Sequence, residues 1–188
     1  MSDGPHRSLK MPRGWKRLAK RADKRAYAPE EVCDALTEAL ERDWHAEVPD
    51  SVCRRVRDIL GDSQSSLFGD QRAERLEALR GETAGYPLCN TFLDYAIFVA
   101  ERGQFGDEAL REAAGKALAD RAARGARQIE EHYCRESTLH RAAHVRERIE
   151  TGIMQLDIDG IAGRLVGISK SGSSRPAKRT GLDEGVQL

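Results

Sequence analysis

Apolar residues recur at the spacing of an amphipathic helix, every third or fourth position, along most of this chain. Alanine, arginine, glutamate and leucine dominate the sequence, runs of β-branched residues are missing, and aromatic residues make up only 5%. Each of these properties favours helices over strands. We therefore expect an all-α fold, a bundle of about five or six helices with a basic N-terminal arm and a flexible C-terminal tail.

The formal net charge of zero hides an uneven distribution along the chain. Residues 1–27 carry seven more basic than acidic residues and residues 170–188 carry two more, so the remaining residues carry an acidic excess of nine. Like charges that are left unpaired repel one another and attract partners of opposite sign. The sequence thus predicts a basic amphipathic arm at 1–27, a helical bundle domain at 28–168 and a flexible basic tail at 169–188.

The most apolar segment comprises residues 88–100, after Pro87 and before Gly103. Its residues are apolar on nearly all sides of a helix, which is typical of the central helix of a bundle. The stretch 153–168 mixes apolar residues with glycines, and its pattern fits either a strand or a short helix.

The basic arm carries the first candidate site. Its cations surround an apolar side formed by Trp15, Leu18 and several alanines. Phosphate groups and acidic proteins both attract such a cluster, so we expect an anionic partner, nucleic acid first and an acidic protein second. Contact with an anionic membrane surface and docking on the acidic body are the alternatives. The predicted contact residues are the cations along the arm: Arg13, Lys16, Arg17, Lys20, Arg21, Lys24 and Arg25.

Three histidines, His132, His140 and His144, lie close together in the sequence. On a continuous helix, Glu136 and His140 have the i,i+4 spacing at which two side chains can share a metal ion, and so do His140 and His144. The apolar stripe of the same helix, which includes Val145, places these side chains on the opposite, solvent-facing side. We therefore favour a solvated histidine face and expect no metal ligands and no cofactor.

The same stretch contains Arg135 and His140, an arginine followed by a histidine after four intervening residues. This spacing, in a helical context at about residues 88–150, resembles the motif of HEPN-domain ribonucleases. The resemblance implies a small all-helical bundle that pairs two sites across a dimer and cleaves RNA without a metal ion. The arginine would then hold the phosphate, and the histidine would move protons during attack by a ribose hydroxyl. Glu136 departs from the neutral polar residue that this family favours after the arginine.

The remaining patterns exclude several other classes of protein. No glycine-rich phosphate loop or nucleophile elbow occurs. The four cysteines include no C-x-x-C pair, so we expect reduced thiols. The sequence has no apolar run of about 18 residues, and no apolar run follows the basic N-terminus, so we expect neither a membrane span nor a signal peptide. We predict a non-enzymatic, cytoplasmic interaction or regulatory protein; the alternative is a HEPN-like ribonuclease, and a homodimer is compatible with either.

Overall fold

Helices are the only regular elements in the part of the chain that the structure describes. This computed structural model describes residues 11–62, 71–136 and 139–168, and the all-α prediction is confirmed over these ranges. Residues 1–10 of the predicted arm and the predicted tail at 169–188 lie outside them. The described elements are α1 (Arg13–Asp23), α2 (Pro29–Glu47), α3 (Asp50–Gly61), α4 (Arg72–Glu77), the 3₁₀ helix η2 (Ala78–Glu82), α5 (Pro87–Glu101), α6 (Gly106–Glu136), α7 (Leu139–Met154) and α8 (Ile158–Leu165).

Local signals in the sequence begin and end several of these helices. Pro29 and Pro87 occupy the first turns of α2 and α5, where their missing N–H groups leave no helical hydrogen bond unmade. The Glu31 carboxylate accepts a hydrogen bond of 3.2 Å from the Ala28 N–H, which satisfies a backbone donor at the start of α2. Gly103, in the turn between α5 and α6, has a φ angle of 73°, which favours glycine over any residue with a Cβ atom.

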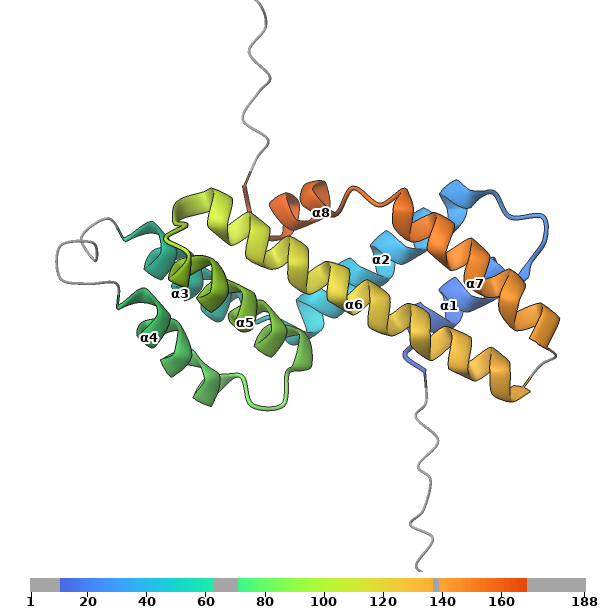
Figure 1. Cartoon of the computed structure of the whole chain (residues 1–188), viewed down its shortest axis with the longest axis horizontal. Coiled ribbons are helices and arrows are strands. Elements are labelled where there is room, and N and C mark those ends of the chain that lie inside the picture. The colour runs from blue at the N-terminus through green and yellow to red at the C-terminus, as the bar shows by residue number, and fades with distance from the viewer. Residues whose placement is uncertain (1–10, 63–70, 137–138, 169–188) are drawn as a thin grey trace, which may run out of the picture.

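The longest helix, α6, is the one that the others surround. It contains 31 residues, which corresponds to a length of about 46 Å, and it contacts α1, α2, α3, α5, α7 and α8. Figure 1 shows α6 crossing the molecule, with α3, α4 and α5 towards one end and α1 and α7 towards the other. Many of its buried positions are alanines, whose small side chains let neighbouring helices approach closely: Ala109, Ala113, Ala114, Ala117 and Ala122.

Helix α5 supplies a large part of the core, although it is not buried on every side. Phe92 and Leu93 are fully buried, whereas Ile97 is half-buried and Phe98 is 42% exposed. The apolar composition of residues 88–100 therefore predicts a core helix correctly, but the central position belongs to the alanine-rich α6. None of the described helices is both long enough and apolar enough to cross a bilayer.

The stretch 153–168 contains a short helix, so of the two alternatives the strand is wrong. The Asp157 carboxylate accepts a hydrogen bond of 3.0 Å from the Gly160 N–H and caps the start of α8. Gly160 and Gly163 are both buried. A Cβ atom at Gly115 of α6 would lie 3.6 Å from Ile158, which shows how closely α6 and α8 pack.

Helix α1 packs as part of the bundle, against α2 and α7. Trp15, Leu18 and Ala22 on its apolar side are buried to at least 99%. The packed body of the protein therefore includes residues 13–23, which the sequence analysis assigns to a separate arm. The physical reason is the stripe of apolar side chains on α1, whose removal from water favours this docking.

A network of polar groups connects α1 to three other helices. The Asp43 carboxylate of α2 is 11% exposed and accepts hydrogen bonds from Trp15 Nε1 of α1 at 2.9 Å and from Arg121 Nε of α6 at 2.7 Å. Arg121 also lies 3.5 Å from Glu47 Oε1, and the second Glu47 oxygen accepts a hydrogen bond of 2.7 Å from the Leu88 N–H at the start of α5. The network thus sets the positions of α1, α2, α5 and α6 relative to one another.

The substitution Gly125→Ala tests the anchoring of α1, because a Cβ atom at Gly125 would overlap the indole ring of Trp15. We expect a loss of about 1–3 kcal/mol in unfolding free energy, despite the higher helix propensity of alanine. Gly115→Ala is the matched control on the same helix, since its Cβ would make only ordinary contacts of 3.5 Å or more, and it should not destabilise. Urea denaturation followed by tryptophan fluorescence measures both. Equal stability of the two variants would contradict this packing.

The two apolar residues Phe92 and Ile97 of α5 test the position of the core. Phe92 is fully buried and packs edge-on against Trp44, with ring centroids 5.1 Å apart, so Phe92→Ala should cost about 3–5 kcal/mol. Ile97 is only half-buried, so Ile97→Ala should cost clearly less. Thermal unfolding followed by circular dichroism compares the stability of the two variants. A loss of stability in Ile97→Ala that equals or exceeds the loss in Phe92→Ala would show that the buried side of α5 is assigned incorrectly.

Candidate anion-binding surface

The cations of α1 gather on one side of the helix. Each residue of an α-helix is turned by 100° about the helix axis. The five cations between positions 13 and 21 therefore lie within about 140° of one another around the axis, opposite the buried side that contains Trp15 and Leu18. Because that apolar side is held in the core, the basic side faces outwards. The members of this surface, called the α1 basic face below, are Arg13, Lys16, Arg17, Lys20, Arg21, Lys24 and Arg25.

Acidic side chains neutralise little of the α1 basic face. Arg17 lies 3.5 Å from Glu38, and both side chains are about half exposed, so solvent screens this pair. Arg21 donates a hydrogen bond to a backbone carbonyl, that of Glu31. Among the described residues, no carboxylate oxygen lies within 4 Å of the other five cations: Arg13, Lys16, Lys20, Lys24 and Arg25.

Two arginines of α7 hold the end of α1 in place. Arg141 donates two hydrogen bonds to the Asp23 carboxylate, one of them 2.7 Å long from Nε. Hydrogen bonding to Arg141 is the main reason that the pKa of Asp23 lies below its ordinary value. Arg148 donates hydrogen bonds to the backbone carbonyls of Arg25 and Tyr27. The backbone at Arg25 is therefore fixed, while its guanidinium group stays exposed to solvent.

A surface pocket of about 500 Å³ lies between the end of α1 and α7, which pack side by side (Figure 1). The pocket, called the α1–α7 pocket below, is lined by Asp23, Arg25, His140, Arg141 and His144. The structure thus brings together Arg25, predicted to bind an anion, and His140, predicted to act in catalysis under the ribonuclease hypothesis. His140 is exposed, and the Nε2 atom of His144 is shielded from solvent without a hydrogen-bond partner in the described part of the chain.

Arg135, the other residue of the ribonuclease hypothesis, is exposed in the last turn of α6. It lies 3.7 Å from Glu131, one turn earlier on the same helix. Arg135 does not line the α1–α7 pocket; the arginines beside His140 there are Arg25 and Arg141. Residues 137–138, which connect the two motif positions, lie outside the described residues.

The remaining histidine and acidic candidates do not form a metal site in the described residues. No group of three or more His, Cys, Asp or Glu side chains in those residues is placed to hold a metal ion. His132 is exposed and stacks edge-on against the ring of Tyr133. The side chain of Glu136 lies outside what the structure describes.

Three further arginines, which were not predicted from the sequence, belong to this region. Arg42 of α2 lies over Gly14, where its guanidinium occupies the space that a Cβ atom would fill, so it adds an exposed cation beside the α1 basic face. Arg141 and Arg148 of α7 form the contacts to the end of α1. Their seven-residue spacing places both on one side of a helix, and this was the signal available in the sequence.

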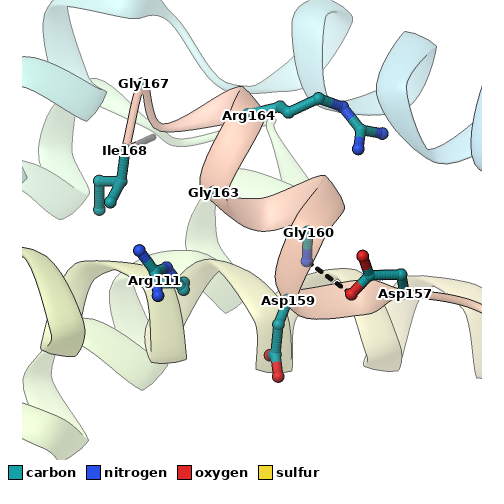
Figure 2. Close-up of a pocket in the computed structure, with 8 residues that line it drawn as sticks. All are labelled: Arg111, Asp157, Asp159, Gly160, Gly163, Arg164, Gly167 and Ile168. Atoms are coloured by element: carbon teal, nitrogen blue, oxygen red, sulfur yellow. Dashed lines mark hydrogen bonds between the residues drawn. The ribbon is translucent and has the colours of Figure 1, made fainter. Parts of the chain in front are cut away.

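A second pocket, of about 460 Å³, lies between α6 and α8 and has a different character. Figure 2 shows the Asp157 carboxylate turned back to the Gly160 N–H and the Arg164 guanidinium turned away from the pocket. Arg164 pairs with Glu41 at 2.9 Å, and Arg111 lies 3.8 Å from Glu108. The described lining of this pocket thus contains two arginines and two carboxylates, Asp157 and Asp159, and carries no positive surplus for an anionic ligand.

Similarity to other proteins gives no guide to the function, because no protein-family model, curated protein or solved structure matches this chain. The strongest guide is the distribution of charge on the surface. The α1 basic face and the α1–α7 pocket adjoin at Arg25, and both present more cations than the described acidic side chains neutralise.

The substitution Asp23→Asn tests the contact between α1 and α7. Because the pKa of Asp23 is lowered in the folded protein, its ion pair stabilises the fold above the unfolded-state pKa of about 3.9 and is lost as the pH falls through the folded-state pKa. We expect Asp23→Asn to cost about 1 kcal/mol at neutral pH and progressively less on acidification. Urea denaturation at a series of pH values measures this. Asp34→Asn, an exposed residue on α2, is the control and should change stability by less than about 0.5 kcal/mol; equal effects would contradict the role of Asp23.

Proposed function

We propose that this protein is a non-enzymatic interaction or regulatory protein of the cytoplasm that binds nucleic acid through the α1 basic face. The observation that supports this most strongly is the set of cations on α1 that have no carboxylate partner among the described residues. Arg13, Lys16 and Lys20 stand on a helix whose opposite side is buried, and Lys24 and Arg25 directly follow its last residue. The charges are therefore carried by a rigid platform, and binding does not require the helix itself to become ordered.

The dimensions of α1 suit the backbone of a nucleic acid. Its 11 residues span about 16 Å, which corresponds to about five base-pair steps of a duplex at about 3.4 Å each. Five cations that have no acidic partner within the described ranges lie along or just beyond this length. Lysine and arginine contacts to phosphates depend on charge and position, so this surface favours binding with little sequence specificity.

The buried side of α1 argues against a membrane surface as the partner. An amphipathic helix binds a membrane by inserting its apolar side between lipid headgroups. On α1 this side contains Trp15 and Leu18, which are packed in the core. An acidic protein is the remaining alternative, since it would also contact the exposed cations.

The ribonuclease alternative receives less support from the geometry. It requires Arg135 and His140 to act on the same phosphate. His140 lines the α1–α7 pocket, whereas Arg135 is exposed on α6, lies beside Glu131 and is not among the pocket residues. Binding without cleavage is therefore the function that we propose.

The double substitution Lys16→Gln and Lys20→Gln tests this proposal. Each phosphate contact contributes about −0.9 to the slope of log affinity against log salt concentration. The parent protein should therefore show a slope of about −4 to −5, and the variant a slope about 2 smaller in magnitude with at least about tenfold weaker binding at low salt. Fluorescence anisotropy with labelled duplex DNA and RNA at a series of salt concentrations measures both.

The control for this experiment is the double substitution Arg54→Gln and Arg102→Gln, which removes the same charge from exposed positions on α3 and at the end of α5. It should leave the salt slope unchanged. Deletion of residues 1–27 is unsuitable because it would remove Trp15 and Leu18 from the core. Absence of salt-dependent affinity for any nucleic acid would overturn the proposal in favour of an acidic protein, and RNA cleavage lost in both Arg135→Ala and His140→Ala would overturn it in favour of the ribonuclease.

A further inference from the structure

We propose that the α1–α7 pocket binds a phosphomonoester group through Arg25, His140 and His144. The first argument is the charge of its lining. Of the two arginines and the one carboxylate among the described residues that line the pocket, Arg141 and Asp23 are joined by two hydrogen bonds and neutralise each other. Arg25 is then left as a cation without a carboxylate partner in the described residues. The described lining of the pocket therefore carries a positive surplus.

The second argument is the state of His144. Its Nε2 atom has almost no contact with solvent and no hydrogen-bond partner within the described ranges, and this is costly for a polar atom in a folded protein. His144 lines the pocket together with His140, which lies one helical turn away on the same side of α7. Because Nε2 is shielded in the ligand-free protein, the imidazole has to turn towards the pocket before a ligand oxygen can accept a hydrogen bond from it, and that bond would then satisfy the atom.

The third argument is the rigidity of the walls. Arg148 fixes the backbone carbonyls of Arg25 and Tyr27, and the pair formed by Asp23 and Arg141 joins α1 to α7. The backbone position of Arg25 relative to α7 is thus set by hydrogen bonds from the α7 arginines before any ligand arrives. Such preorganisation reduces the entropy that is lost on binding.

The nature of the lining identifies the class of ligand. Guanidinium and imidazole groups donate hydrogen bonds, and the only carboxylate among the described lining residues is already bound to Arg141. This excludes a bare cation and favours an anion with several acceptor oxygens, which a phosphomonoester provides. The pocket, with a volume of about 500 Å³, has room for a larger molecule that carries the phosphate group.

Two sources could supply this group. One is the terminal phosphate of a nucleic acid lying along the α1 basic face, which adjoins the pocket at Arg25; this source rests on the proposed function. The other is a free nucleotide. Both present the same chemistry to Arg25 and the histidines.

The first experiment uses inorganic phosphate and adenosine monophosphate as probes of the full-length protein. Each should shift the ring-nitrogen resonances of His144 in ¹⁵N nuclear magnetic resonance spectra in a saturating manner, whereas chloride at matched ionic strength should not. His144→Gln should weaken phosphate binding at least about tenfold, and His45→Gln, an exposed histidine on α2 outside the pocket, should leave it unchanged. Arg25→Gln, at an exposed position, provides the same test if His144→Gln does not fold. A phosphate response equal to that of chloride, or unchanged in both pocket variants, would overturn the proposal.

The second experiment distinguishes the two sources and separates this proposal from the proposed function. If the source is a nucleic-acid end, an oligonucleotide with a 5′-phosphate should bind several-fold more tightly than the same oligonucleotide with a 5′-hydroxyl, and His144→Gln should remove the difference. If the source is a nucleotide, adenosine monophosphate should compete with inorganic phosphate while the two oligonucleotides bind equally. Saturable phosphate binding without any oligonucleotide binding would support the pocket and refute the nucleic-acid function. Oligonucleotide binding that depends on Lys16 and Lys20, without any phosphate response at His144, would do the opposite.

Discussion

The carboxylate of Asp43 is the group on which the arrangement of the helices depends. A charge that is removed from water is tolerated only when hydrogen bonds and opposite charge replace the lost hydration. Trp15 of α1 and Arg121 of α6 supply these contacts, and Arg121 continues the network to Glu47. Because Trp15 must lie in the core to reach Asp43, α1 is held with its apolar side inwards and its cations outwards.

The outward orientation of these cations links the fold to the proposed function. In an isolated helix the same residues would repel one another, and the apolar side of the helix would compete for a membrane or a partner. Because α1 packs against α2 and α7, its apolar side is no longer available to a membrane or a partner, and its cations form a rigid basic surface. The α1–α7 pocket extends this surface beyond the end of α1, where Arg148 fixes the backbone. The α1 basic face and the pocket therefore meet at Arg25.

The sequence predicts much of the secondary structure and part of the site. The stripe of Trp15 and Leu18 predicts an amphipathic basic helix, and the apolar run at 88–100 predicts a core helix; both are present. The sequence does not predict that Arg25 and His140 line one pocket, since each was assigned to a different function. Their shared pocket requires α1 and α7 to pack together, and no periodicity within either helix specifies its neighbour.

The sequence by itself determined that most of the chain is helical and which side of these helices is apolar, because both depend on residues three or four positions apart; it left 153–168 open between a strand and a helix. The tertiary structure decided which helices pack together, because that depends on partners far apart in the chain, such as Asp43 with Arg121, 78 positions later. It also depends on where a missing side chain allows close approach: Gly125 lies against the indole of Trp15, and no larger residue would leave room for that ring. The same packing turned a set of cations into an oriented surface, since burial of one side of α1 is what exposes the other.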